Sequence, residues 1–162
     1  MKIGILSDTH DQLARCEQAV ALLQAAGAEA LVHCGDLTEA DILSACAVLP
    51  CYFVFGNNDY HSVAPLREMA EVTGATALEL GGIIHLADKS IAVTHGHLRV
   101  EERRLLAQNP DYLLRGHTHI VEDRREGVTR FINPGALHRA RQFTVALLDL
   151  ASDQLTMIPI PR

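Results

Sequence analysis

His117 and His119 stand two positions apart directly after a glycine, and the same spacing joins His95 and His97. Imidazole nitrogen is a common ligand of divalent metals. Residues i and i+2 that leave a strand point to the same side, so each pair can aim two imidazoles at one point. A single pair of this kind is more often structural. Two pairs, each tied to a glycine, favour a metal site.

Oxygen ligands occur in the same setting. Asp8 and His10 repeat the i, i+2 spacing, so a carboxylate and an imidazole can chelate one ion. Asp36 follows a glycine, which lets the chain turn sharply and can bring the carboxylate up from a strand. Asn57 also follows a glycine and offers a neutral side-chain oxygen. Taken singly, these residues have structural alternatives as helix caps or turn residues.

Each of these segments follows an apolar run that predicts a strand. The runs are residues 2–7, 30–34, 51–55, 90–94 and 111–115. In open α/β sheets, ligands bind outside the carboxyl ends of the strands, so short loops at one edge can bring all the donors together. Imidazole and oxygen donors without thiolate suit manganese, iron, zinc or nickel. We therefore expect two divalent ions at this edge.

The elements that position these donors form two groups along the chain. Helices are expected over 12–26, capped by Asp11, and over 39–48 and 65–72. Their alternation with the first three strands predicts a partly parallel sheet. Beyond residue 75, strands are expected over 76–80, 83–87, 90–94, 111–115, 128–132, 143–150 and 155–160, with a helix over 100–108. We assign these later strands to a second, mostly antiparallel sheet.

The expected fold class is α/β, with residues 1–162 as a single domain. The architecture is a four-layer α-β-β-α sandwich of two mixed sheets flanked by helices, with the metal site at the carboxyl ends of the strands. The remaining histidines are assigned to strands (His33, His85) and to loops (His61, His138).

Composition excludes several classes of function. The net charge of −6 argues against a binder of duplex nucleic acid or of a membrane surface, although bound metal would still allow a small phosphate-bearing substrate. The four cysteines, Cys16, Cys34, Cys46 and Cys51, form no C-x-x-C pair, so we expect reduced core residues and a cytoplasmic protein. No apolar run resembles a signal peptide or a membrane span. The sequence is compatible with either a monomer or a homo-oligomer.

The ordered motifs resemble those of the calcineurin-like metallophosphoesterases. They are Asp8-x-His10, Gly35-Asp36, Gly56-Asn57-x-Asp59, His95-Gly96-His97 and Gly116-His117-x-His119. With the short chain and Asn133-Pro134-Gly135, they are similar to the small uncapped bacterial and archaeal phosphodiesterase branch. The resemblance implies hydrolysis of a small phosphodiester. The alternatives are a phosphomonoesterase, a nuclease, which the acidic charge disfavours, and a catalytically silent protein-binding scaffold like the retromer subunit of this fold.

The resemblance also implies a ligand set. One ion is assigned to Asp8, His10, Asp36 and His119, and the second to Asp36, Asn57, His95 and His117. Asp36 then bridges the ions, and manganese is the first choice. The net charge of such a site is about +1 when two divalent ions, two carboxylates and a bridging hydroxide are counted. A diester monoanion would neutralise this charge, and the hydroxide would then attack the phosphorus in line.

Three further residues, Asn58, Asp59 and His97, are the catalytic candidates beside the ligands. Many relatives carry histidine where this chain has Asn58, and that histidine is proposed to protonate the leaving group. An amide is no general acid, so we expect a preference for diesters with good leaving groups. Arg139 and Arg141 can contact a substrate phosphate, the alternative being a solvated loop.

Overall fold

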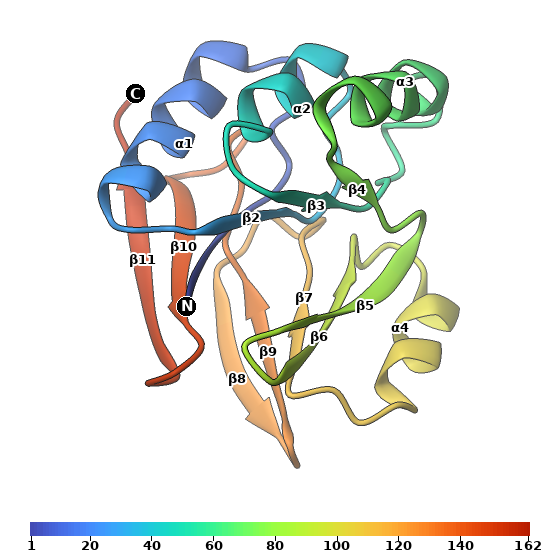
Figure 1. Ribbon diagram of the computed structural model, residues 1–162, viewed down its shortest axis with the longest axis vertical. Coiled ribbons are helices and arrows are strands. Elements are labelled where there is room, and N and C mark those ends of the chain that lie inside the picture. Colours follow the sequence, from blue (N-terminus) through green and yellow to red (C-terminus); the bar gives the residue numbers. More distant parts are fainter.

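The computed structural model describes residues 1–162, which form two packed sheets and four helices (Figure 1). The strands are β1 (Lys2–Leu6), β2 (Ala30–His33), β3 (Cys51–Phe53), β4 (Thr76–Ala77), β5 (Gly81–Leu86), β6 (Lys89–Thr94), β7 (Tyr112–Leu114), β8 (Glu122–Glu126), β9 (Thr129–Asn133), β10 (Phe143–Asp149) and β11 (Gln154–Ile160). The helices are α1 (Leu13–Ala25), α2 (Ala40–Cys46), α3 (Val63–Thr73) and α4 (Arg99–Leu106).

The sheets pack face to face between the helices. The first sheet has the order β11-β10-β1-β2-β3-β4, and the second has the order β5-β6-β7-β9-β8. Helices α1, α2 and α3 cover the outer face of the first sheet, and α4 covers the second (Figure 1). The predicted four-layer α-β-β-α sandwich of two mixed sheets is therefore confirmed.

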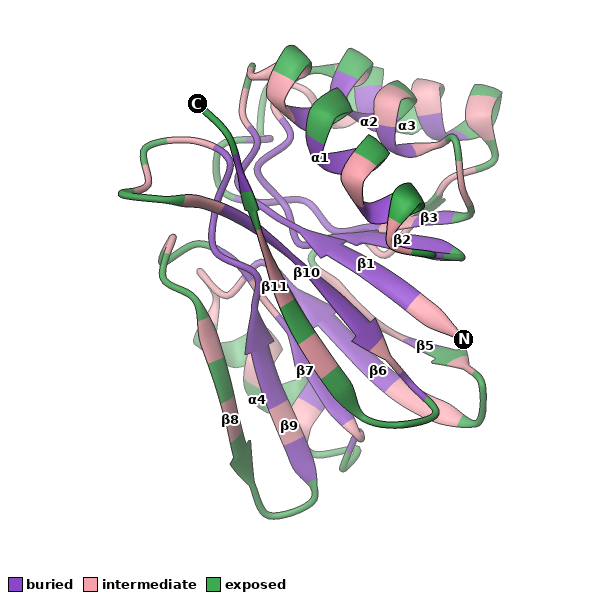
Figure 2. Ribbon diagram, turned by 90° about the vertical axis from the view of Figure 1, so that its left-hand side faces the viewer, coloured by how far each residue is buried: buried purple, intermediate pink, exposed green.

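Alternating side chains explain why the central strands are apolar at nearly every position. In β1, Ile3 and Ile5 point between the two sheets, whereas Leu6 points toward α1–α3. Gly4 shares the helix-facing side, where a Cβ atom would lie 2.9 Å from Cδ1 of Leu23, so the glycine lets α1 pack closely. A strand covered on both faces needs apolar residues on both. Figure 2 shows this strand buried along most of its length.

The second sheet follows the same rule. Ile91 and Val93 of β6 face the first sheet, while Ala92 between them packs with Leu105 of α4. The two large apolar layers hold 20 and 15 buried residues, and the layer under α4 holds only 4. The first sheet and its three helices, together with the layer between the sheets, therefore supply most of the buried apolar contacts.

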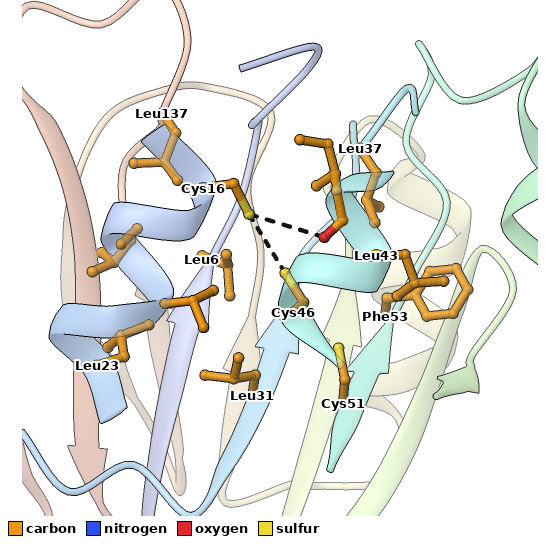
Figure 3. Packing of buried hydrophobic residues seen from close by; sticks show 14 of the residues in the cluster. Leu6, Cys16, Leu23, Leu31, Leu37, Leu43, Cys46, Cys51, Phe53 and Leu137 are labelled. Carbon is orange, nitrogen blue, oxygen red and sulfur yellow. Dashed lines mark hydrogen bonds between the residues drawn. The ribbon is translucent and has the colours of Figure 1, made fainter. Parts of the chain in front are cut away.

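All four cysteines are free and buried, as expected of core residues. Cys16 of α1 and Cys46 of α2 place their sulfur atoms 3.7 Å apart, above Leu6 and Leu31 of the first sheet (Figure 3). Cys34 instead lies in the layer between the sheets.

The assignment of β10 and β11 to the second sheet was wrong. β10 pairs antiparallel with β1, with Lys2 opposite Asp149, so β10 and β11 complete the first sheet. β4 also belongs to the first sheet, where it pairs parallel with β3. The second sheet is mixed rather than mostly antiparallel, because β6, β7 and β9 run parallel. Apolar periodicity identifies a strand but not its partner, since the pairing is decided by residues far away in the chain.

Two local predictions also failed. The sequence did not indicate β8, an edge strand made entirely of charged residues, in which Asp123 binds Arg130 of β9 and Glu122 binds Arg115. Edge strands are often charged, which removes the apolar signal. Asp11 does not cap α1, because its carboxylate accepts the side-chain amide of Gln12 at 2.6 Å instead. The other expected elements end within about two residues of their observed bounds, except β4, which is shorter. None of the four helices has the length and apolar character needed to cross a bilayer.

Candidate metal centre

The candidate ligands meet at the carboxyl ends of five strands. Asp8 follows β1, Asp36 follows β2, Asn57 follows β3, His95 follows β6 and His117 follows β7. Backbone hydrogen bonds tie the loops together. The amides of Asp8 and His10 donate to the carbonyls of Gly35 and Asp36 at 3.0 and 2.9 Å. The predicted placement at strand ends is therefore what the fold produces.

Two groups of donors lie within reach of an ion. Asp8, His10 and His119 form the first, and Asp8, Asp36 and His95 form the second, with the ligand atoms of each group all within 4.8 Å of one another. Nε2 of His119 lies 3.2 Å from Asp8 Oδ1, and Nε2 of His95 lies 3.4 Å from Asp36 Oδ2. Asp36 Oδ2 also lies 3.7 Å from Nε2 of His10, so this carboxylate faces both groups.

The Asp8 carboxylate has an unused oxygen. Its Oδ2 accepts the Ser7 hydroxyl at 2.6 Å and the His117 amide at 3.0 Å, whereas Oδ1 is buried without any hydrogen-bond partner. A buried acceptor without a donor is costly, and a cation would satisfy it. Two ligand atoms each about 2.1 Å from one ion lie roughly 3–4 Å apart, which the separations in these groups match. The residues present therefore fit a bound divalent metal.

The orientation of His95 supports the same conclusion. Its Nδ1 lies 2.8 Å from the Cys34 carbonyl, to which it donates, so Nε2 is the atom turned toward Asn57 Oδ1 at 3.1 Å. Burial lowers the pKa of His95, but the carboxylates of Asp36 and Asp8 outweigh burial and raise it above the usual value. The negative charge that holds a proton on Nε2 is the charge that would attract a cation.

The ligand loops contain backbone conformations that residues other than glycine rarely adopt. Positive φ angles occur at Asp8 (53°), His10 (49°), Asp36 (58°), His117 (68°) and His119 (59°). Left-handed backbone of this kind costs of order 1–3 kcal/mol per residue and persists only where surrounding contacts impose it. Here the hydrogen bonds between the loops impose the left-handed backbone. As a result, the donor side chains turn back toward one point.

Gly116 allows the closest approach between two loops. A Cβ atom at Gly116 would overlap Ser7 Oγ and lie 2.6 Å from Asp8 Oδ2. We expect Gly116→Ala to separate the His117 amide from Asp8, to lower stability by about 1–3 kcal/mol and to reduce the metal bound per chain. Gly74→Ala is the control. A Cβ atom at Gly74 would have no other atom within 4 Å, so only the φ of 76° disfavours alanine there. Thermal unfolding and metal content test this, and unchanged metal content in Gly116→Ala would contradict it.

His33, at the end of β2, joins the ligand loops that follow β1 and β2. Its Nδ1 accepts the Gly35 amide at 3.2 Å, so Nε2 carries the proton and donates to the Thr9 hydroxyl. Thr9 lies between Asp8 and His10, so one imidazole fixes the loops after β1 and β2. The sequence placed His33 correctly in a strand but did not reveal this link, because a strand-end histidine has no distinguishing spacing. Burial, aided by the nearby His95, lowers the pKa of His33 to about 3.

This depressed pKa predicts a pH-dependent stability. In the unfolded chain His33 takes up a proton below its ordinary pKa of 6.5, whereas in the folded chain it does so only near pH 3. The stabilisation is therefore complete above pH 6.5 and is lost as the pH falls from 6.5 toward 3, by at most about 1.4 kcal/mol per unit. Urea unfolding of the metal-free protein between pH 7 and 5 measures it. His33→Gln should show a shallower slope, and equal slopes would refute the assignment.

The three catalytic candidates differ in setting. Asp59 is buried and accepts the backbone amides of Asp36 (2.9 Å), Thr38 (2.7 Å) and Gly56 (2.7 Å), which makes it a link between loops. Asn58 donates its backbone and side-chain N–H groups to the two oxygens of Asp36 at 2.8 and 2.6 Å. Burial raises the pKa of Asp36, but these bonds and His95 hold it well below its usual value.

His97 and His117, which lie beside His95, are less tightly packed than the donor groups. The ring of His117 lies 5.1 Å from that of His95 and 6.1 Å from that of His97, and its side chain belongs to neither donor group. His97 packs 5.3 Å from His95. Burial, with the neighbouring imidazoles, lowers the pKa of His97, and its Nδ1 is buried without a partner.

Asn133, at the end of β9, holds the loop that carries His117 and His119. Its side-chain amide donates to the Gly116 carbonyl at 2.8 Å and to the Thr118 hydroxyl at 3.1 Å, and its Oδ1 accepts the Gly135 amide. In the sequence, the Asn133-Pro134-Gly135 segment was notable only for its resemblance to the small phosphodiesterase branch. The asparagine is the residue that contacts the site.

A polar cavity of about 540 Å³ opens beside the first donor group, and no hydrophobic residue lines it. Arg139 lies on its wall, whereas Arg141 does not. His138 also lines it, with its ring 4.4 Å from that of His10. The sequence assigned His138 correctly to a loop, but no signal there indicated this position.

The chain resembles known proteins over most of its length. The profile of the calcineurin-like phosphoesterase superfamily domain matches residues 1–153. A phosphodiesterase of Methanocaldococcus jannaschii is 28% identical over 138 residues, covering 83% of each chain. A probable metallophosphoesterase of the same organism is 30% identical over 148 residues, which cover 84% of this chain and 68% of that protein.

Solved structures agree with this assignment. A structure described as a novel archaeal phosphodiesterase superposes with a TM-score of 0.88 at 25% identity, covering 99% of this chain and all of that one. Vps29 of Entamoeba histolytica, at a TM-score of 0.66 and 17% identity over 99% of this chain and 100% of that one, shares the fold. The chain therefore belongs to the calcineurin-like phosphoesterase superfamily and is a metal-dependent phosphoesterase.

Proposed function

We propose that the protein is a dinuclear phosphodiesterase that hydrolyses small phosphodiesters. The observation that carries the proposal is the pair of donor groups that share Asp8, whose Oδ1 is buried without a partner, while Asp36 faces both groups. The relative that is 28% identical and the structural neighbour with a TM-score of 0.88 are both described as phosphodiesterases, which supports a diester substrate.

The proposed ligands are those of the family resemblance, and they overlap the two donor groups: the first set adds Asp36 to the first group, and the second set keeps Asp36 and His95 of the second group. One ion is held by Asp8, His10, Asp36 and His119, and the second by Asp36, Asn57, His95 and His117. His117 needs only a side-chain movement to join, since its residue is exposed and its ring lies beside His95. Manganese is the first choice of metal, with iron, zinc and nickel as alternatives. Two bound divalent ions would lower the pKa of a water held between them and offset the charge of the phosphate.

The surrounding residues orient the ligands and the substrate. Asn58 fixes the Asp36 carboxylate through two hydrogen bonds, and Asp59 fixes the loops that carry Asp36 and Asn57. Arg139 forms no ion pair and lines the polar cavity, so its guanidinium is free to bind a phosphate oxygen. The His138 ring packs against His10 and closes the same wall.

Metal analysis coupled to turnover tests the proposal. We expect about two metal ions per chain and manganese-dependent hydrolysis of bis(p-nitrophenyl) phosphate, with slower hydrolysis of the monoester p-nitrophenyl phosphate. His117→Ala should lose the activity, whereas His85→Ala, at an exposed position of β5, should retain it. A protein that binds no metal and stays inactive after reconstitution would favour a protein-binding scaffold. Faster hydrolysis of the monoester would favour a phosphomonoesterase.

A further inference from the structure

The candidate metal centre is flanked by two pockets of opposite character. The polar cavity beside His10 and His119 has no hydrophobic wall. On the other side, a second pocket of about 290 Å³ is lined by nine residues, four of them hydrophobic. The hydrophobic walls are Phe55, Tyr60, Val63 and Leu80. A substrate at the metal centre therefore meets water and polar groups on one side and an apolar surface on the other.

The second pocket adjoins the metal centre directly. Asn57 and His97 form part of its wall. Asn57 Oδ1 lies 3.1 Å from Nε2 of His95, and the ring of His97 lies 5.3 Å from that of His95. A group attached to a phosphate at the ions can therefore reach the pocket without any further movement of the chain.

The walls of this pocket suit an uncharged aromatic ring. Tyr60 is 79% exposed and Leu80 is 47% exposed, although both are large apolar side chains that a core would normally bury. The charge of Arg67 is paired with Glu79, so the pocket offers no free charge to an anion. Its other polar groups are the side chains of Asn57 and His97 and the hydroxyl of Tyr60. Ligand pockets commonly combine such an apolar wall with a few polar groups.

The size of the pocket points to a single planar group. A cavity of about 150 Å³ is enough to hold benzene, and this pocket has about 290 Å³. Stacking on an exposed tyrosine contributes about 1–3 kcal/mol per aromatic base and is tolerant of the ring's identity. A second phosphate or a sugar would gain little from these walls and would find better partners in the polar cavity.

We propose that the pocket formed by Phe55, Tyr60, Val63, Leu80 and His97 binds an uncharged aromatic ring of the substrate, an aryl group or a nucleobase, by stacking on Tyr60. The inference rests on the proposed phosphodiesterase function, and it names the class of diester: one ester group carries a planar ring, and the other is polar. The phosphate itself stays with the ions and does not contact Tyr60.

Kinetics of Tyr60 variants test the proposal. For bis(p-nitrophenyl) phosphate, we expect Tyr60→Ala to raise KM about tenfold with kcat unchanged, because stacking acts equally in the bound substrate and the transition state. Tyr60→Phe, which keeps the ring, should restore KM. Val72→Ala, an equally exposed position of α3 outside the pocket, should behave as the unchanged protein. Inhibition by inorganic phosphate should be the same in all of them. An unchanged KM in Tyr60→Ala overturns the aromatic site and leaves the phosphodiesterase proposal intact.

A binding measurement separates the two proposals if hydrolysis is absent. The chain has no tryptophan, so Tyr60→Trp places a single tryptophan in the pocket, and this residue can be excited selectively over the remaining tyrosines. Uncharged p-nitroanisole and thymidine are then titrated as probes of an aryl ring and of a nucleobase. Saturable quenching that Leu80→Asp abolishes supports the site even in an inactive protein, and the probe that saturates at lower concentration identifies the ring. Absence of saturation with both probes overturns the proposal.

Discussion

Asp8→Asn is expected to empty the metal centre while making the metal-free protein more stable. The asparagine oxygen can take over the two hydrogen bonds of Oδ2, from the Ser7 hydroxyl and the His117 amide. Its NH₂ group then replaces Oδ1, the buried oxygen that lies 3.2 Å from Nε2 of His119 and 4.0 Å from that of His95. A donor at that position repels a cation.

The two effects have opposite signs for a physical reason. Without metal, Oδ1 is a charged buried acceptor with no donor, whereas the neutral NH₂ group of asparagine can donate to Nε2 of His119, so the substitution relieves a penalty of about 1–3 kcal/mol. With metal at 100 times its Kd, the unchanged protein gains about 2.7 kcal/mol that the variant does not. Because Asp8 belongs to both donor groups, activity on bis(p-nitrophenyl) phosphate should fall by at least ~10²-fold, the upper end of what losing an outer partner of a metal ligand costs.

Thermal unfolding with and without manganese, together with metal content, measures all three effects. Asp88→Asn is the control, since Asp88 lies in the exposed β5–β6 turn with a φ of 61°, which asparagine also adopts. A variant that keeps both ions, or whose metal-free form is less stable than the unchanged protein, would contradict this account of Oδ1.

The position of the site was predictable because it depends on local pattern. Asp8 and His95 come directly after an apolar run, Asp36 follows one after a single glycine, and the carboxyl ends of parallel strands meet at one edge. The fold class followed from the same runs. Residue types and spacing were therefore sufficient to place the donors at one edge before any contact was known.

The supports of the site could not be predicted, since they are contacts between distant parts of the chain. The link from His33 to Thr9 joins residues 24 positions apart, and the bond from His95 to the Cys34 carbonyl joins residues 61 positions apart. No spacing within one segment encodes such a contact. The same holds for β10, whose pairing with β1 closes the first sheet across almost the whole chain.

Asp59 illustrates how spacing can indicate a site without indicating the role of each residue in it. Its position two residues after Asn57 made it a catalytic candidate, but its oxygens accept three backbone amides and its side chain is fully buried. These contacts support a positioning role. Motif spacing identifies residues near a site, whereas the hydrogen bonds decide whether a residue faces the substrate or the scaffold.

Asn58→His is expected to bring the rates for alkyl and nitrophenyl diesters closer together. Asn58 lines the polar cavity and donates to Asp36, so it stands at the mouth of the site but has no proton to give to a leaving alkoxide. Nitrophenolate leaves without protonation, whereas an alkoxide needs an acid whose contribution is typically about 10²–10⁴-fold. The unchanged protein should therefore discriminate strongly against alkyl esters, and an imidazole at this position should recover part of that factor.

The measurement is the ratio of kcat/KM for bis(p-nitrophenyl) phosphate to that for a dialkyl phosphate, in the unchanged protein, Asn58→His and Asn58→Gln. Glutamine keeps an amide and should leave the ratio high, which separates proton donation from a change in side-chain size. Metal content must be equal in the three proteins, because the hydrogen bonds from Asn58 to Asp36 also orient a proposed ligand. Equal rates for the two ester classes in the unchanged protein would mean that another group already supplies the proton. His138, whose ring packs against His10 on the same cavity wall, would then be the first residue to replace.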